Sequence, residues 1–509
     1  MCRSSNIGHS LSEQHEGGER GCSWPPAPAL HMTIPSQIEE TTKRIQELHA
    51  RKALLLQEVD EVEQELREVQ AKHGRLVNQC VAVFKLPREL LADIFYMCQE
   101  MWLMTSPNHP SKPFEVVASH VSSYWREIAL GTPLLWNNIR LHITSRRNGD
   151  HHTQRLMAYL TCSGNCLLDI SLRIVVPQDI SQFLCLLVPH ANRWHRVSIF
   201  LTHCVTTDVY ASLCGVATPA LVHLSLCVGN PRDDPLSPRT EYPSMSPPIL
   251  TDAPLLSFVR VAGMAVGNME PPLGAVTTLH IDAWPRNLMN QSRFQAMFNA
   301  LPCLVNLSLT GLNIHLPRDP LHVSSPMLMP TLRSLRIRGN ATPYHRFLSL
   351  ITVPRLESLS LHSVVTFDSA PLPTLRSLTL DSCDLSENEI RNIMKVFPHV
   401  STFSVDHSVL HTFLLHNMMT EGLWPRLEAI SLRQLQPDDA ASFCLLSLSR
   451  SGDRGCLRRV RVDRRSRNVL KTKGYLQTLR SALLVEHVDH VDPWPPDLGY
   501  EDPDDDWDY

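Results

Sequence analysis

This 509-residue sequence has few aromatic residues, a small net charge and no long apolar runs. Its 47 basic and 51 acidic residues leave a formal net charge of −4. The chain therefore lacks the basic surplus that nucleic acids and anionic membranes attract. No apolar run approaches the roughly 20 residues that span a bilayer. We expect no nucleic acid or membrane partner, and a cytoplasmic location with the nucleus as a second compartment.

The motifs of common catalytic sites are absent as well. The sequence has no Gly-rich phosphate loop ending in Gly-Lys-Ser/Thr, no Gly-x-Ser-x-Gly elbow and no His-Glu-x-x-His helix. Cys162 and Cys166 are four residues apart, but no second Cys or His pair has the spacing of a zinc site. The 14 cysteines are scattered, and we interpret them as buried free thiols. The sequence favours a protein that is not an enzyme and uses no metal ion or cofactor.

A long charged helix is predicted near the N-terminus. Residues 1–33 are rich in Gly, Ser, Pro and charge, which predicts disorder, and translation could start at Met32 instead of Met1. Over residues 34–78 apolar residues recur at heptad spacing: Ile45, Leu48, Leu55, Val59, Val62, Leu66 and Val69. Two interpretations remain open, a single helix laid along the helices that follow it, or a coiled coil that forms a homodimer.

Two short amphipathic helices are predicted between residues 84 and 141. The first follows Pro87 and has apolar residues at helical spacing, namely Leu90, Leu91, Ile94 and Phe95. The second repeats the pattern with Val117, Val121, Tyr124, Trp125 and Ile128. Their apolar surface is too small for an independent domain, so we expect them to pack on each other and on other parts of the chain.

The string Leu-Pro-x-Glu-Leu-Leu-x-x-Ile-Phe, then Val-Ser-x-x-Trp-Arg-x-Ile-Ala and Pro-Leu-Leu-Trp, resembles the F-box. The resemblance is strongest to the F-box-like domain of the large mushroom-type fungal families. It departs from them in a long interval at 98–112 and in Ser122-Ser123, where typical members have Cys-Arg. The resemblance implies docking on the Skp adaptor of a cullin-based ubiquitin ligase through Leu86, Pro87, Leu90, Leu91, Ile94, Val121 and Trp125.

An internal repeat occupies residues 216–485. Three apolar residues recur with fixed spacers, as in Leu304-Leu307-Leu309, and from there onward the copies start 19 to 30 residues apart. This spacing is close to that of leucine-rich repeats. A proline stands two residues before the first apolar position in copies across the array: Pro219, Pro254, Pro302, Pro330, Pro354, Pro373, Pro398 and Pro425. We expect each proline to fix where the chain turns into a strand.

Each repeat unit is expected to be a short strand plus a helix. The run 375–385 fits the whole leucine-rich-repeat string, and Ser386 with Glu389 predicts a capping box that opens a helix. The predicted fold is therefore α/β, an N-terminal helix and small all-α F-box followed by an irregular leucine-rich-repeat solenoid. The remaining parts are a connecting α/β segment at 142–215, a loop at 229–250 and an acidic tail at 486–509, which is predicted to be disordered after Val491.

Side chains between the apolar positions of the strands should face the concave side of such a solenoid. Small hydroxyl residues dominate there, and the charged ones are our candidates for binding a protein substrate: Arg336, Arg338, His362, Asp381, Asp406, Arg433 and Arg461. Two functions follow. The first is a substrate receptor of a Skp–cullin–F-box ubiquitin ligase, and the alternative is an interaction scaffold whose F-box is a structural cap.

Overall fold

A computed structural model describes most of the chain. The described residues are 34–105, 112–144, 149–176, 180–202, 206–228, 249–263, 271–282, 288–311, 313–315, 327–339, 348, 351–364, 371–383, 385–406, 418, 424–451, 455–488 and 494. The predictions for residues 1–33, including the start at Met32, lie outside them, as does most of the predicted loop. The chain divides into two units, residues 1–86 and 87–509.

The first unit contains one long helix. Helix α1 runs over Ile34–Cys80 and is followed by a short 3-10 helix, η1, at Ala82–Lys85, which confirms the helix predicted at 34–78. Every apolar residue of its heptad seam is more than half exposed. Among the described helices of the whole chain, none is long and apolar enough to cross a membrane.

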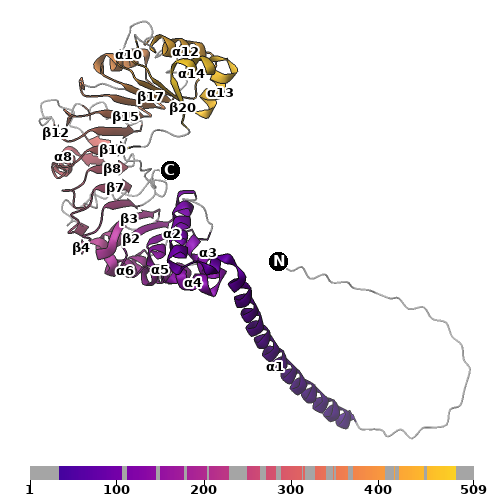
Figure 1. The fold of residues 1–509 in the computed structure, drawn as a ribbon. Coiled ribbons are helices and arrows are strands. Elements are labelled where there is room, and N and C mark those ends of the chain that lie inside the picture. Colours follow the sequence, from indigo (N-terminus) through magenta and orange to yellow (C-terminus); the bar gives the residue numbers. More distant parts are fainter. Residues whose placement is uncertain are drawn as a thin grey trace, which may run out of the picture. The chain divides into compact units, whose positions relative to one another are not determined.

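The second unit is built on a parallel sheet of 14 strands, and the strands follow one another in chain order (Figure 1). The fold is thus mixed α/β, as predicted, with an open sheet. It begins before residue 216, because the segment predicted as a connection already contributes strands. The strands are β1 Asn138–Ile143, β2 Leu168–Ile174, β3 Trp194–Leu201, β5 His223–Val228, β7 Phe258–Gly263, β8 Thr278–Asp282, β10 Asn306–Thr310, β13 Ser334–Arg338, β15 Ser358–His362, β16 Ser377–Asp381, β17 Thr402–Asp406, β18 Ala429–Arg433, β19 Arg459–Val462 and β20 Leu484–His487.

The repeated apolar residues form continuous buried rows across this sheet. Leu307 of β10, for example, is in register with Leu279 of β8 and Leu335 of β13, and all three are buried. A strand with one apolar side buries it only against its neighbours, so the rows hold the array together. The second and third apolar positions of a copy, such as Leu307 and Leu309, are two residues apart, which is the strand period.

The prolines stand in tight turns that lead into the strands. The N–H of Leu356 donates to the carbonyl of Val353 at 3.2 Å, and that of Leu375 donates to Leu372 at 3.1 Å. In each turn the proline is the second of four residues, where its fixed φ suits the backbone. Each proline is therefore part of the turn that precedes the strand. The prediction that the prolines fix where the chain turns into a strand is confirmed for β15 and β16.

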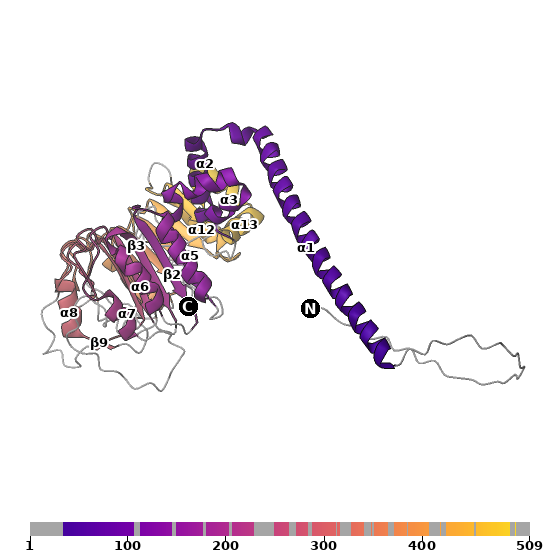
Figure 2. The ribbon, with the colours of Figure 1, turned by 90° about the horizontal axis from the view of Figure 1, so that it is seen from below.

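Helices and short strands connect the strands of the large sheet. The helices are α5 Gly149–Cys162, α6 Ser181–Leu187, η4 Val188–Arg193, α7 Thr206–Leu213, α8 Gln291–Asn299, α10 Glu387–Val396, α12 Ala440–Ser449, α13 Arg464–Thr472 and α14 Tyr475–Ala482. Figure 2 shows α5 and α6 beside β2 and β3. The capping box is confirmed, since Ser386 accepts from the Glu389 N–H and Glu389 accepts from the Ser386 N–H.

The expectation of a strand plus a helix in every unit needs correction. Several connections contain short strands that pair in parallel outside the main sheet. These pairs are β4 Val216–Ala217 with β6 Leu250–Thr251, β9 Leu288–Asn290 with β11 Asn313–His315, and β12 Met327–Leu328 with β14 Ile351–Thr352. The backbone N–H and C=O groups of these extended connections form hydrogen bonds with the equivalent connection of the next unit. This pairing replaces the hydrogen bonds that a helix would form within itself.

The segment predicted to form two helices forms three. They are α2 Arg88–Thr105, α3 Phe114–Val121 and α4 Ser123–Leu130, followed by the 3-10 helix η2 Pro133–Trp136. The break falls at Ser122, whose backbone is extended and whose hydroxyl accepts from the Trp125 N–H at 3.1 Å. Ser122, noted above as a departure from the F-box pattern, therefore serves as the N-cap of α4.

These helices share a small aromatic core. Phe95 of α2 lies with its ring centre 5.9 Å from that of Phe114 and 4.8 Å from that of Trp125. Leu91 and Phe95 are each 1% exposed. The indole N–H of Trp136 donates to the carbonyl of Ala129 at 2.7 Å, which fastens η2 to the end of α4. The helices pack on one another, as the sequence predicted.

A buried carboxyl group links the helices to the sheet. Glu115 of α3 accepts from Gln99 of α2 at 3.1 Å and from the hydroxyl of Tyr159 on α5, and Gln99 also donates to the carbonyl of Leu135 at 2.7 Å. Burial raises the pKa of Glu115, against the lowering effect of the hydrogen bonds from Tyr159 and Gln99. The cluster joins α2, α3, η2 and α5, so the helices and the first strands form one unit.

We expect the stabilising effect of Glu115 to depend on pH. Because the pKa of Glu115 is raised, the folded chain binds the proton of this carboxyl group more tightly than the unfolded chain does. The stabilisation by protonated Glu115 is therefore complete below the pKa of the unfolded chain. It is lost as pH rises through the pKa of the folded chain. The difference in free energy of unfolding between the native chain and Glu115→Gln should move in favour of the native chain as pH falls from about 8 to about 5. Denaturant titrations at each pH measure this difference. A constant or opposite trend would contradict it.

The cysteines are free thiols in the described residues, but most are not buried. Cys227, Cys383 and Cys444 are buried, whereas the others are exposed or half-buried. The expectation of buried thiols is therefore correct for these three only. Cys383 donates to the carbonyls of Leu361 and Asp381 at 3.3 and 3.4 Å, and burial raises its pKa to about 11.

Candidate functional site

An exposed line of apolar side chains runs along α2. Leu90, Ile94, Met97 and Met101 recur every three or four residues, so they lie on one side of the helix. Leu90 is 51% exposed and Met101 is 66% exposed. We call these four residues the apolar stripe. A helix whose opposite side already fills a core and which still exposes such a stripe is typical of a docking surface.

The predicted adaptor contacts separate into surface and core. Pro87, Leu90, Ile94 and Val121 are exposed, and Leu86 and Trp125 are half-buried. Leu91 lies in the core. It is four residues before Phe95, so the two side chains lie on the same face of α2, whereas Leu90 lies on a different face. Leu91 is therefore a packing residue. Met97 and Met101 were missed, although the spacing of Leu90 and Ile94 continues directly into them.

The second candidate surface is the polar side of the large sheet, which we call the polar strand face. It carries the side chains that alternate with the buried apolar rows. One row across neighbouring strands reads Arg260, His280, Ser308, Arg336, Ser360, Thr379, Ser404, Ser431 and Arg461. Five of the predicted substrate contacts form the adjacent row, in the order Arg338, His362, Asp381, Asp406 and Arg433.

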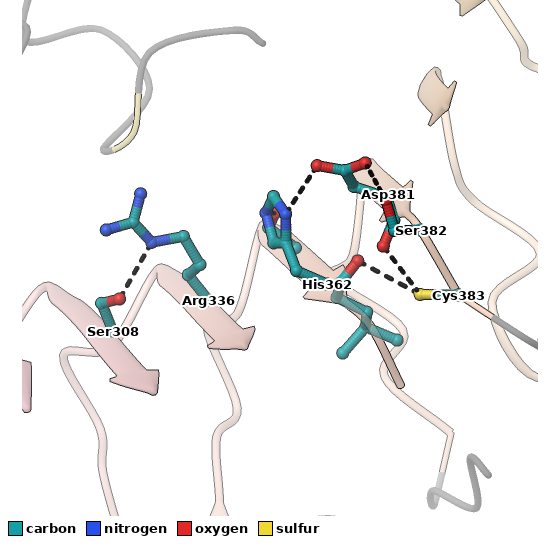
Figure 3. A network of polar contacts seen from close by, with 8 residues as sticks. Ser308, Arg336, His362, Asp381, Ser382 and Cys383 are labelled. Carbon is teal, nitrogen blue, oxygen red and sulfur yellow. Dashed lines mark hydrogen bonds and ion pairs between the residues drawn. The ribbon is translucent and has the colours of Figure 1, made fainter. Parts of the chain in front are cut away.

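Two of the predicted substrate contacts are buried instead of exposed. Arg336 donates through Nε to the hydroxyl of Ser308 at 2.9 Å (Figure 3). Its guanidinium group also lies 3.5 Å from Nδ1 of His280. His362 is also buried. Side chains on adjacent strands are close enough to cover one another, and sequence alone does not reveal this. Four of the other predicted contacts are half-buried, namely Arg338, Asp381, Arg433 and Arg461. The side chain of Asp406 is not among those that the structure describes.

His362 connects two strands through both of its ring nitrogens. Nδ1 is 2.8 Å from Oδ2 of Asp381 (Figure 3). Nε2 is 2.9 Å from the hydroxyl of Ser360. Burial lowers the pKa of His362, while the hydrogen bond to Asp381 opposes that shift. The neutral ring that results donates from Nδ1 to the carboxylate and accepts the Ser360 proton at Nε2.

This order of Ser, His and Asp resembles that of a catalytic triad. Ser360, however, is only 6% exposed, so an acyl substrate cannot reach its hydroxyl in this arrangement. The backbone of β15 pairs with β13 and β16 on its two sides, so its N–H groups are not available as an oxyanion hole. We interpret the network as a means of fixing the orientation of polar side chains on a binding surface.

A buried ion pair lies in the same face and was not singled out from the sequence. Nε of Arg260 on β7 is 2.6 Å from Oδ2 of Asp282 on β8, and both side chains are less than one tenth exposed. The repeat pattern contained the necessary signal, since Arg260 lies between Val259 and Val261. The set of charged residues that line this face therefore begins earlier in the chain than Arg336.

Trp494 contradicts the prediction that the acidic tail is wholly disordered. It is 7% exposed. The guanidinium carbon of Arg336 lies 4.5 Å from the centre of its ring, and the ring of His280 lies 5.1 Å away. No periodicity surrounds Trp494 in the sequence, so no pattern could have placed it. This tail residue rests on the polar strand face.

Comparison with known proteins adds no assignment. A scan against protein-family models finds no match, and a search of curated proteins finds no match either.

Proposed function

We propose that this chain is the substrate receptor of a Skp–cullin–F-box ubiquitin ligase. In this proposal α2, α3, α4 and η2 are an F-box-like module, and the strands form a leucine-rich-repeat-like solenoid. The observation that carries the proposal is the apolar stripe of α2, which is exposed while Leu91 and Phe95 on the other side fill the core. The stripe is the surface for the Skp adaptor, together with Val121 on α3.

The repeat array has the complementary task of holding a protein substrate. Its polar strand face presents charged and hydroxyl side chains on rigid parallel strands, which suits recognition of an extended partner. Ubiquitin transfer then occurs in trans, because the receptor only brings substrate and the transferring enzyme together. In this proposal the receptor is not itself an enzyme.

Reconstitution tests this proposal directly. Purified full-length chain is mixed with a purified Skp-type adaptor and analysed by size-exclusion chromatography with light scattering. A stable complex with one adaptor per chain is expected, with a dissociation constant near or below about 1 μM, as is usual for a standard-size interface. Absence of a complex with any adaptor of the source organism would refute the proposal.

A scaffold without a link to ubiquitin is the second candidate. The observation in its favour is the buried cluster of Glu115, Gln99 and Tyr159, which fixes the helices to the segment at the first edge of the sheet. Solenoids need such caps to cover their terminal strands. The reconstitution separates the two candidates, since a helical cap has no need to bind the adaptor.

We also propose that α1 forms a homodimeric coiled coil. Its seam from Ile45 to Val69 is apolar and exposed, and burial of each such side chain contributes about 1.5 to 3 kcal/mol. The Lys52 that interrupts the seam would weaken the pairing and restrict its register.

A double substitution tests the dimer. Leu55→Asp with Val62→Asp should convert a dimer into a monomer at about 10 μM chain, because four buried carboxylates per dimer cannot be paired. Sedimentation equilibrium measures the mass of the full-length chain. Gln64→Ala, off the seam on the same helix, is the matched control and should remain dimeric. A native chain that is monomeric at this concentration would contradict the proposal.

A further inference from the structure

The polar strand face is covered in its centre and open toward its ends. On β2 and β16 buried and half-buried residues alternate, as expected where one side of a strand faces solvent. On β5, β7 and β8 every residue is buried. Polar side chains there, such as Ser225 and His280, are therefore shielded from solvent as fully as the apolar rows.

Trp494 lies on this covered part. It contacts His280 of β8 and Arg336 of β13. The last strand, β20, ends at His487 and is six places further along the sheet than β13. Within seven residues of sequence, the chain therefore returns from the edge of the sheet to its middle. A residue that belonged to the final repeat unit would contact β19 or β20 instead.

Three guanidinium groups lie near the buried His280, which Trp494 contacts. Arg260, Arg336 and Arg338 all act on His280, whose own pKa is well below its usual value because of burial and of these neighbouring charges. Asp282 balances Arg260 at 2.6 Å. A guanidinium group 4.5 Å from an indole ring is in range for a cation–π interaction.

The sequence around Trp494 complements this charge. It reads Asp-Pro-Trp-Pro-Pro-Asp over residues 492–497, and further acidic residues follow from Glu501. The indole Nε1 has no hydrogen-bond acceptor among the described residues. A buried donor without an acceptor costs free energy, so the tryptophan is held less firmly than its burial alone suggests.

We propose that the polar strand face between β7 and β13 is a binding site for an aromatic side chain carried by an acidic, proline-flanked peptide. The chain's own Trp494 occupies it, and a partner segment of the same chemistry replaces the tail. The idea that this partner is a ubiquitination substrate rests on the proposed function, whereas the site itself does not.

A labelled peptide with the sequence of residues 488–503 tests the site. Fluorescence polarisation measures its binding to the full-length native chain and to full-length Trp494→Ala. Because the native tail competes within the same molecule, the peptide should bind Trp494→Ala at least about tenfold more tightly than the native chain. A peptide with alanine in place of its tryptophan should bind neither chain.

Further variants separate a site from a packing defect. Adding Arg336→Gln to Trp494→Ala should weaken peptide binding at least about tenfold, whereas adding Arg333→Gln, at an exposed arginine outside the strands, should not. Trp494→Leu keeps an apolar cover without the indole ring and should also bind the peptide more tightly than the native chain. Circular dichroism checks the fold of each variant.

Three results would overturn the proposal. They are equal peptide affinity for the native chain and Trp494→Ala, equal affinity of the peptide without tryptophan, and loss of folding in both Trp494→Ala and Trp494→Leu, which would make Trp494 a core residue. Adaptor binding by the same variants is measured in parallel and should be unchanged. Failure of the site and failure of the receptor function are thereby distinguished.

Discussion

Leu90→Asp combined with Ile94→Asp is expected to weaken binding of a Skp-type adaptor at least about a hundredfold, by placing carboxylates in a buried apolar contact. Both residues belong to the apolar stripe and are exposed in the free chain. Stability should therefore change by no more than about 0.5 kcal/mol for each substitution. Calorimetric titration of the adaptor gives the affinity, and thermal unfolding gives the stability.

Leu91→Ala provides the contrasting variant one position away. Leu91 is 1% exposed in the core of the helices, and its truncation should destabilise them by about 2 to 5 kcal/mol. Glu127→Gln is the matched surface control, because Glu127 pairs with Arg88 at 2.8 Å with both side chains largely exposed. Its effect on affinity and stability should be small. An unchanged affinity of the Leu90 and Ile94 variant would exclude the stripe as the docking surface.

Asp282→Ala is expected to cause the largest loss of stability in the sheet. It leaves the guanidinium group of Arg260 in an interior position without the carboxylate at 2.6 Å. Breaking a buried ion pair by removing one partner costs about 3 to 5 kcal/mol, because the remaining charge stays desolvated. Denaturant unfolding followed by circular dichroism measures the loss.

Two further variants are compared with Asp282→Ala, one at an exposed ion pair and one that removes both buried charges. Glu357→Gln disrupts the pair of Arg333 and Glu357, which are 3.6 Å apart and more than half exposed, so it should cost less than about 1 kcal/mol. Replacing Arg260 by Met together with Asp282→Leu removes both charges and should recover most of the lost stability. If Asp282→Ala cost no more than Glu357→Gln, the pair would not be the buried link that its geometry indicates.

The strands could be predicted from the sequence because their signal is local. Leu378 and Leu380 of β16 are two residues apart, which is the strand period, and a proline marks the turn before the strand. The capping box at Ser386 and Glu389 is equally local, and it is present. The short strands that pair beside the main sheet carry too few residues for a period to be read.

The candidate site was harder to predict because burial on the polar face depends on contacts between strands. Arg336 and His362 have the same alternation as exposed residues, and only the neighbouring strands show that they are enclosed. Trp494 is the extreme case, since its contacts lie more than 150 residues away in sequence. On α2 the sequence located the apolar face but could not separate Leu91 from Leu90.

We propose that the exposed stripe of α2 couples this chain to a ubiquitin ligase. The most direct measurement is affinity purification of the full-length chain from its own cells, native and with Leu90→Asp and Ile94→Asp, followed by mass spectrometry of the partners. We expect a Skp-type adaptor and a cullin to be recovered with the native chain and lost with the variant, while other partners remain. Recovery of the same partners by both chains, or of no adaptor by either, would contradict it.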